Sequence, residues 1–268
     1  MFIYTLTNFE SRATIDVDFL LRGYSNSIDD VKELICKIID TPTGNDYIEM
    51  RAKGFEEISP QRKYHGISTQ IIAQIKNVRV PFNVDIGVGD IIVPRAEERT
   101  INTQLPDFEA PVIKTYSLES TIAEKFDAIL QRFELTGRMK DFYDIYYLSR
   151  TFDFEGAKLQ AAIFETLQRR GTPYDRESFK RVVALAGDED MQKRWKFFLK
   201  TIKDDTLEFT FVIAEIQTFL EPVFDAIVNE NEWQNIWKSN AKKWSNLKGV
   251  LTVTRAVNDA YENIKYIE

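Results

Sequence analysis

The feature that most constrains the fold is a change of periodicity near Ser117. Before it, strand-like runs separated by glycine-containing or charged breaks occupy residues 12–21, 47–58, 64–75 and 79–93. After it, apolar residues recur at helical spacing, first as Ile122, Phe126, Ile129, Leu130 and Phe133. The pattern predicts an α+β protein in which a small mixed β-sheet core with helices, residues 1–115, precedes an all-helical C-terminal domain, residues 116–268.

One helix is expected within the first part of the chain. Ser27 is placed to cap it, and its apolar residues are Val31, Leu34, Ile35 and Ile38. Six further helices are expected downstream, over residues 117–133, 139–150, 154–170, 175–186, 190–202 and 207–228. The last third of the chain is predicted to be entirely helical.

Composition excludes several classes of protein. No apolar run approaches the roughly 20 residues of a membrane helix, so we expect a soluble, cytoplasmic protein without a membrane partner. The formal net charge of −7 argues against indiscriminate coating of nucleic acid, although local basic patches are compatible with it. A single cysteine, Cys36, and a single histidine, His65, exclude an internal disulfide and a zinc site built from several thiolates or imidazoles.

Two carboxylates interrupt the first apolar strand. Side chains alternate along a strand, so Asp16 and Asp18 point to one face while Val17 and Phe19 point to the other. Like charges this close repel unless a cation lies between them, and carboxylate oxygens are the ligands that Mg²⁺ prefers. The alternative is a solvated strand face on which the acids have no ligand.

A third strand acid, Asp85, lies between Val84 and Ile86. A D-x-D pair with a distant aspartate is one arrangement that holds one or two Mg²⁺ ions against a nucleoside triphosphate (NTP). Asp16, Asp18 and Asp85 are therefore our candidate metal ligands, and we expect them on one side of the sheet.

Charged residues on the first two downstream helices allow two interpretations. Lys125 lies in an apolar helix, and Asp141 and Asp144 share a face at i,i+3 spacing. With Arg138 and Lys140 they could form a salt-bridged surface, as charged helical residues usually do. Alternatively, Lys125 would hold triphosphate oxygens, and the acids would orient that lysine or the acceptor hydroxyl. In that case we expect Lys125 to add little to the stability of the core.

The segments "SRATIDVDFL", "YHGISTQI", "FNVDIGVGD", "STIAEKFDAIL" and "GRMKDFYDIYYL" occur in an order and at a spacing that resemble the AbiEii/AbiGii nucleotidyltransferase toxins. The resemblance covers residues 1–148. It implies a DNA polymerase β-like nucleotidyltransferase core followed by a helical domain, and a toxin that an AbiEi-like antitoxin neutralises.

The resemblance also implies roles for individual residues. Asp16 and Asp18 match the metal-binding pair, Asp85 the third strand acid and Lys125 the nucleotide-contacting lysine, while Asp141 and Asp144 match the acids of the last motif. These six are the candidate catalytic residues. The candidate nucleotide-binding residues are Arg12, Thr14, Lys125 and Lys140.

The expected function is Mg²⁺-dependent transfer of a nucleotide from an NTP to an acceptor, for which the family suggests RNA such as tRNA. One departure bears on this expectation. Family members carry a K-G-G or G-S type turn just before the first matching segment, and here Met1 stands where that turn should already have ended. Either translation starts further upstream, or the chain is naturally shortened. The rival interpretation is a degenerate nucleotidyltransferase that acts by binding an antitoxin or nucleic acid.

Two basic, aromatic stretches are candidates for contacts with nucleic acid. They are "QKRWKFFLKTIK", residues 192–203, and "IWKSNAKKWSNLK", residues 236–248. The competing interpretation of the first stretch is an amphipathic helix that buries Trp195, Phe198 and Leu199.

Overall fold

The computed structural model describes residues 2–14, 16–25, 27–42, 47–58, 66–88, 92, 94–104 and 108–246. His65 lies outside these ranges. The chain divides into two compact units, the first formed by Met1–Ile91 with Thr100–Ile113, and the second by Ile92–Arg99 with Lys114–Glu268. The first combines a sheet with helices and the second is mainly helical, which confirms the α+β fold class.

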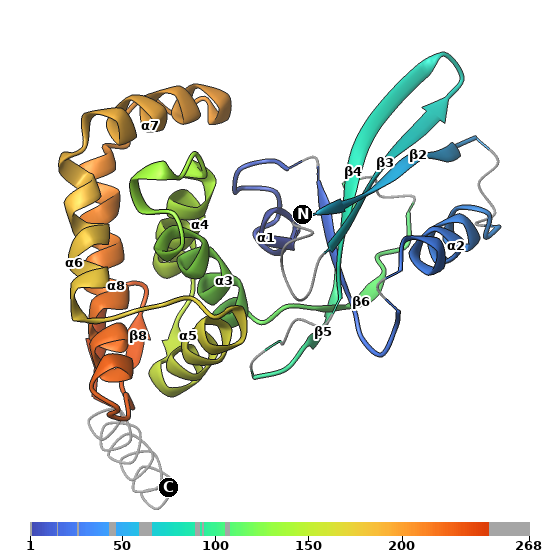
Figure 1. The fold of residues 1–268 in the computed structure, drawn as a ribbon. Coiled ribbons are helices and arrows are strands. Elements are labelled where there is room, and N and C mark those ends of the chain that lie inside the picture. The colour runs from blue at the N-terminus through green and yellow to red at the C-terminus, as the bar shows by residue number, and fades with distance from the viewer. Residues whose placement is uncertain are drawn as a thin grey trace, which may run out of the picture. The chain divides into compact units, whose positions relative to one another are not determined.

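Unit 1 is built on a four-stranded mixed sheet of order β1-β4-β3-β2 (Figure 1). Strand β1 runs parallel to β4, whereas β3 is antiparallel to both β4 and β2. Its elements are α1 (Phe2–Leu6), β1 (Val17–Leu21), α2 (Ile28–Ile39), β2 (Glu49–Ile58), β3 (Gly66–Ile75) and β4 (Val78–Val88). The expected strands and the expected helix are therefore present, and α1 is an element that the pattern did not reveal.

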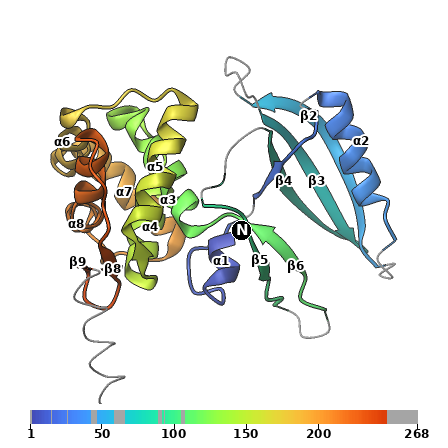
Figure 2. The same ribbon diagram turned by 90° about the horizontal axis from the view of Figure 1, so that it is seen from below.

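Helix α2 covers one face of this sheet (Figure 2). It begins as the sequence predicts, because the Ser27 side chain accepts a hydrogen bond from the Asp30 backbone N–H at 3.1 Å. Its buried residues Val31 and Ile35 belong to one core cluster with buried sheet residues, which are Ile67, Ile71, Val84 and Ile86. Cys36 is only partly buried and is not in that cluster.

A second, two-stranded sheet lies at the boundary between the units. Strands β5 (Glu97–Thr100) and β6 (Val112–Thr115) pair with each other, and the Ile101 backbone N–H donates to the Pro111 carbonyl at 2.9 Å. The chain passes from one unit to the other within each of these strands, between Arg99 and Thr100 in β5 and between Ile113 and Lys114 in β6.

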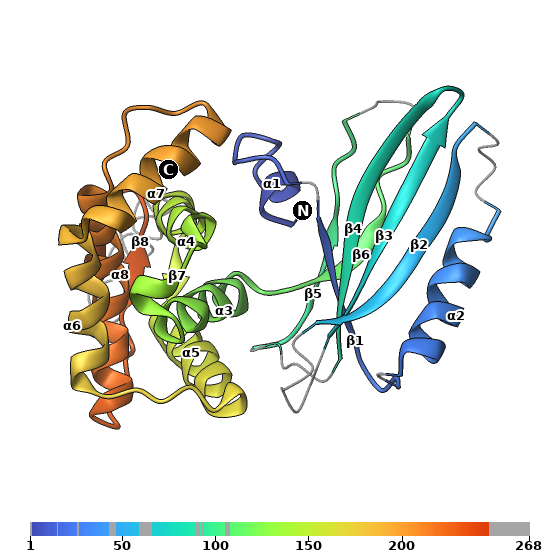
Figure 3. The same cartoon turned by 45° about the horizontal axis from the view of Figure 1, so that its top comes forward.

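Unit 2 contains the six helices expected after Ser117 (Figure 3). They are α3 (Leu118–Leu130), α4 (Met139–Thr151), α5 (Gly156–Arg170), α6 (Arg176–Ala184), α7 (Glu189–Ile202) and α8 (Phe209–Val228). Aromatic side chains fill the core, and the rings of Phe126, Phe179 and Phe224 lie with centroids 5.6 to 5.7 Å apart. Among the helices that the structure describes, none has both the length and the apolar character needed to cross a membrane.

The last third of the chain is not entirely helical, so that prediction was wrong. Strands β7 (Phe154–Glu155), β8 (Ile236–Lys238) and β9 (Lys243–Ser245) form a small sheet. Trp237 is buried at its centre, and its indole N–H donates to the Ser149 carbonyl at 2.6 Å. Strands of two or three residues are too short to show a period, and β7 pairs with a strand about 80 residues away.

Candidate functional site

The strand register sets two of the candidate acids side by side. Asp18 on β1 pairs with Asp85 on β4, and directly paired residues of neighbouring strands point to the same face. Val84 and Ile86 point into the core under α2, so the acids lie on the opposite face of the sheet. Asp16 lies one residue before β1, and its Oδ1 accepts a hydrogen bond at 3.3 Å from the side-chain amide of Asn83, which is two residues before Asp85 on β4.

Asp85 has a further partner that the sequence did not indicate. Ser68 on β3 is in register with Asp85, and its hydroxyl donates to Asp85 Oδ1 at 2.6 Å. This hydrogen bond restricts the orientation of the carboxylate. Ser68, Asp85 and Asp18 therefore form a polar row across three adjacent strands.

The acid strand is more exposed than its apolar character suggests. β1 is an edge strand, Asp18 is exposed, Asp16 and Asp85 are partly buried, and even Phe19 is 50% exposed. Among the strands that the structure describes, β1 pairs only with β4, which accounts for this exposure. The carboxylates do not have to be desolvated in order to stand together.

The donor set of this row fits a magnesium ion. Mg²⁺ is usually held by one or two carboxylates, with waters and substrate phosphates completing its octahedron. Asp18 and Asp85, with Asp16 beside them, supply oxygen ligands of this kind. Within the described ranges no group of three or more His, Cys, Asp or Glu side chains is close enough to hold a metal ion by itself.

A second polar cluster lies inside unit 2 and joins α3 to α4. The Lys125 ammonium lies 2.7 Å from Asp144 Oδ2 and 3.6 Å from Asp141 Oδ1. The two carboxylates are buried, whereas 17% of the Lys125 side chain remains exposed. These residues do form ion pairs, but in the interior of the unit rather than on a solvated surface.

Arg138 completes the charge balance of the cluster. Its guanidinium Nε donates to Asp141 Oδ2 at 2.5 Å, so two cations face two buried anions. Asp141 lies in the first turn of α4, where the helix dipole favours a negative charge. Its second oxygen, Oδ1, accepts no hydrogen bond from any residue that the structure describes. That oxygen retains accepting capacity beside the lysine.

Contacts from α7 hold the start of α4 in place. The Arg194 guanidinium donates to the carbonyls of Glu134 and Thr136, both at 2.9 Å. The Thr136 hydroxyl in turn accepts from the Arg138 backbone N–H at 3.1 Å. The turn that presents Arg138 and Asp141 is thus fixed by a residue more than 50 positions away.

The remaining nucleotide-binding candidates are less constrained. Thr14 donates through its hydroxyl to the Asp16 carbonyl at 3.5 Å, and Arg12 is partly buried in the segment before β1. Lys140 lies exposed in the first turn of α4, next to Asp141.

Sequence reasoning missed a buried acid close to Lys125. Asp127, on α3, is fully buried and accepts hydrogen bonds from the Thr172 hydroxyl, Gln131 Nε2 (2.8 Å) and Arg170 (3.1 Å). Thr172 and Arg170 follow more than 40 residues later in the chain, so no local pattern marks the network. It ties α3 to the end of α5 and to the segment that follows α5.

The chain matches a known protein family over most of its length. A family model described as "Nucleotidyl transferase AbiEii toxin, Type IV TA system" matches residues 2–234, nearly the whole chain. The match places the chain among nucleotidyl transferases by family. The protein belongs to the AbiEii toxin family of type IV toxin-antitoxin systems, which confirms the resemblance found in its motifs.

Two solved structures from Helicobacter pylori are similar to the chain. JHP933 is 13% identical over 82% of this chain and 79% of its own, with a TM-score of 0.39. A putative nucleotidyltransferase is 11% identical over 87% of this chain and 88% of its own, with a TM-score of 0.42. No curated protein matches the chain.

Proposed function

We propose that the protein transfers a nucleotide from an NTP to an RNA acceptor such as tRNA, and that an AbiEi-like antitoxin counteracts it. Membership of a nucleotidyl transferase toxin family supports the reaction class and the antitoxin. The acceptor is the finer part of the proposal and follows from the family resemblance.

The observation that carries the proposal is the pairing of Asp18 with Asp85 on the face of the sheet away from α2. Asp18 and Asp85, with Asp16 beside them, would supply oxygen ligands to Mg²⁺ there, and waters and substrate phosphates would complete its coordination. When bound, the ion supplies positive charge that stabilises the triphosphate oxygens during transfer. Ser68 would keep Asp85 oriented through its 2.6 Å hydrogen bond.

Lys125 is suited to contact the triphosphate. An ammonium group has three N–H donors, and two of them can serve Asp144 and Asp141. One donor is left for a phosphate oxygen. Asp144 fixes the position of the ammonium, and Asp141 Oδ1 lies 3.6 Å from it as a second anionic neighbour.

The test of the reaction is transfer of labelled nucleotide from each NTP to total RNA in the presence of Mg²⁺. Asp18→Ala should reduce transfer at least about 100-fold, because losing a metal ligand removes several kcal/mol of transition-state stabilisation. Asp29→Asn, which neutralises an exposed acid at the start of α2, is the matched control and should retain activity. Equal transfer by wild type and Asp18→Ala would refute the assigned role.

Binding can be tested separately from turnover through the melting temperature. Mg-NTP that binds only the folded protein should raise it, and the shift should grow with ligand concentration. Lys125→Gln should abolish most of the shift. The expectation that Lys125 adds little to stability has to be revised, because its removal leaves Asp141 and Asp144 buried with one cation fewer.

A double variant separates the two effects of Lys125. Lys125→Gln combined with Asp144→Asn restores the charge balance and should recover much of the lost stability without recovering the ligand-dependent shift. If wild-type protein shows neither a melting shift nor heat of binding at millimolar Mg-NTP, the degenerate binding protein becomes the better assignment.

A further inference from the structure

Helix α7 presents an exposed face that its packing does not explain. Its buried side is formed by Met191, Trp195 and Leu199. On the opposite side, four residues at i, i+3, i+4 and i+7 fall within about 100° of the helix circumference. They are Lys193, Lys196, Phe197 and Lys200, which we call the α7 face. Phe197 is 71% exposed, so an aromatic ring stands in water among three lysines.

The charges of the α7 face are only partly neutralised. Lys193 forms an i,i+3 ion pair with Asp190 at 3.1 Å. Lys180 on α6 forms the same kind of pair with Glu177 at 2.7 Å. Lys196 and Lys200 form no ion pair with any residue that the structure describes. Like charges at i,i+4 destabilise a helix slightly, and the chain as a whole is acidic with a net charge of −7. Asp204 and Asp205 follow the helix, so the excess positive charge lies on its middle and last turns.

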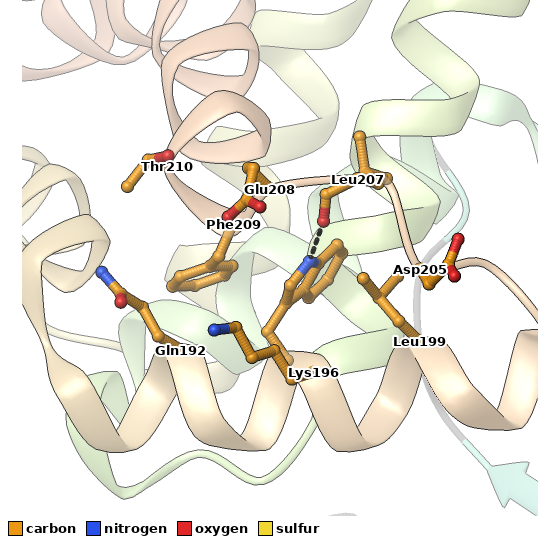
Figure 4. A pocket seen from close by; sticks show the side chains of 9 residues that line it. Gln192, Lys196, Leu199, Asp205, Leu207, Glu208, Phe209 and Thr210 are labelled. Atoms are coloured by element: carbon orange, nitrogen blue, oxygen red, sulfur yellow. Dashed lines mark hydrogen bonds between the residues drawn. The ribbon is translucent and has the colours of Figure 1, made fainter.

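A small pocket shares Lys196 with this face (Figure 4). Lys196, Asp205 and Glu208 line it, and the rings of Trp195 and Phe209, with centroids 5.4 Å apart, contribute apolar surface. The Trp195 indole N–H is already satisfied by the Leu207 carbonyl at 2.7 Å. The pocket holds about 100 Å³. Small-molecule sites measure about 300 to 1,000 Å³, so an extended ligand lying along the helix fits this region better than an enclosed small molecule.

Helix α7 is also in direct contact with α4, which carries Asp141 and Asp144. The Phe198 ring packs edge to face on Tyr143 of α4 with centroids 5.7 Å apart. Arg194 holds the carbonyls of the turn before α4, as described above. A ligand on the α7 face would therefore bind the element that positions the start of α4.

We propose that the α7 face binds a single-stranded segment of the RNA acceptor. Lys196 and Lys200 would contact successive phosphates, and Phe197 would stack on an unpaired base. This proposal rests on the proposed function for the identity of the acceptor, but its chemistry comes from the α7 face. An exposed ring between lysines matches a ligand that alternates flat bases with anionic phosphates. A lipid surface fits less well, because the apolar side of α7 is buried and only Phe197 could insert.

The test is binding of a fluorescently labelled RNA oligonucleotide of about 12 nucleotides, followed by anisotropy at several salt concentrations. NTP and Mg²⁺ are omitted, so the measurement does not depend on catalysis. Lys196→Glu with Lys200→Glu should weaken binding about tenfold or more near 0.05 M salt and make the log–log salt dependence shallower by about 1.4. Phe197→Ala should weaken binding about fivefold or more with little change in the salt dependence.

The matched control is Lys32→Glu with Lys53→Glu, which makes the same change in net charge at two exposed lysines of unit 1. It should retain nearly all of the binding. Equal loss in both double variants would show a general charge effect and overturn the proposal, as would absence of RNA binding by the wild type at low salt. Tight binding of duplex RNA, unaffected by Phe197→Ala, would rule out stacking on a single strand. Full RNA binding without nucleotide transfer would support RNA binding by the α7 face and would contradict the proposed function.

Discussion

At the scale of single residues, helix α3 carries two charged groups whose partners differ in kind. Lys125 is partly exposed and pairs with two acids of α4, an arrangement that leaves a donor for a ligand. Asp127, two positions later, is fully buried and accepts from three side chains. The first group is poised to interact with something outside the unit, whereas the second holds the unit together.

Asp127→Ala should therefore destabilise the protein strongly. Arg170, Gln131 and Thr172 would lose a shared acceptor, and breaking a buried charge pair costs about 3 to 5 kcal/mol. Urea unfolding measures the change. Glu177→Ala removes an exposed ion pair with Lys180 and should change stability by less than about 1 kcal/mol. A loss for Asp127→Ala no larger than that of this control would show that the network is not structural.

At the scale of elements, the pKa of an acid in the first turn of a helix depends on the neighbouring elements as well as on the helix itself. Glu119 lies in the first turn of α3, a favourable place for an acid. Burial nevertheless raises the pKa of its carboxyl above the usual value, and the charges of Glu97 and Glu155 add to the rise. Its own backbone N–H and Lys158 act in the opposite direction without reversing it.

The sign of the resulting pH dependence follows from linkage. The folded state binds the Glu119 proton more tightly than the unfolded state, so this stabilisation is complete below about pH 4 and is lost as the pH rises through the folded pKa. Glu119→Gln should thus be more stable than wild type at pH 7, with the difference vanishing near pH 4. Urea unfolding of both proteins between pH 4 and pH 7 tests this prediction. The control Glu189→Gln, exposed at the start of α7, should instead be slightly destabilising at pH 7.

Helix α5 begins at Gly156. Alanine is the better helix former, but the space around this position does not admit it. The Gly156 N–H donates to the Asn235 carbonyl at 2.8 Å, and an added Cβ would lie 2.5 Å from Trp233 Cδ1 and 2.6 Å from the Asn235 carbonyl oxygen. Gly156→Ala should destabilise the protein by about 1 to 3 kcal/mol in thermal or urea unfolding. At Gly187 nothing lies within 4 Å of an added Cβ, so Gly187→Ala should be tolerated. Equal tolerance at both positions would contradict this account.

At the scale of the whole molecule, two cores support the two compact units. Unit 1 buries aliphatic side chains between α2 and the sheet, including Ile67, Ile71 and Val84. Unit 2 packs aromatic rings, among them Phe126 and Phe224. Because each cluster lies within one unit, damage to one core should affect mainly its own unit.

Hydrogen exchange read by mass spectrometry tests this independence. Ile67→Ala should cost about 2 to 5 kcal/mol and speed exchange in β1, β3 and β4 more than in α3 to α8. Phe224→Ala should have the reverse effect, with a cost of about 3 to 5 kcal/mol. Similar acceleration across both units in both variants would instead show that the chain unfolds as a single cooperative body.

Much of the fold was predictable because its signals are local. Strand and helix periods and the Ser27 cap act between residues within about four positions of each other. Short elements without a full period were missed, namely α1, the β5–β6 pair and the β7–β8–β9 sheet. Among the candidate site residues, Asp18 and Asp85 lie side by side through the β1–β4 register, whereas Asp16 lies just before β1, where strand alternation does not apply. Their roles in metal and nucleotide binding stay predictions.

The sequence by itself determined the class of fold, the positions of the long elements and the family, because periodicity and motif order are properties of the linear chain. Only the tertiary structure decided which residues meet. Strand register brings Ser68 to Asp85, helix packing buries Asp141 and Asp144 around Lys125, and loop closure brings Thr172 to Asp127. These pairings depend on the burial of side chains from distant segments, and the free energy of such contacts is not encoded in any short stretch of sequence.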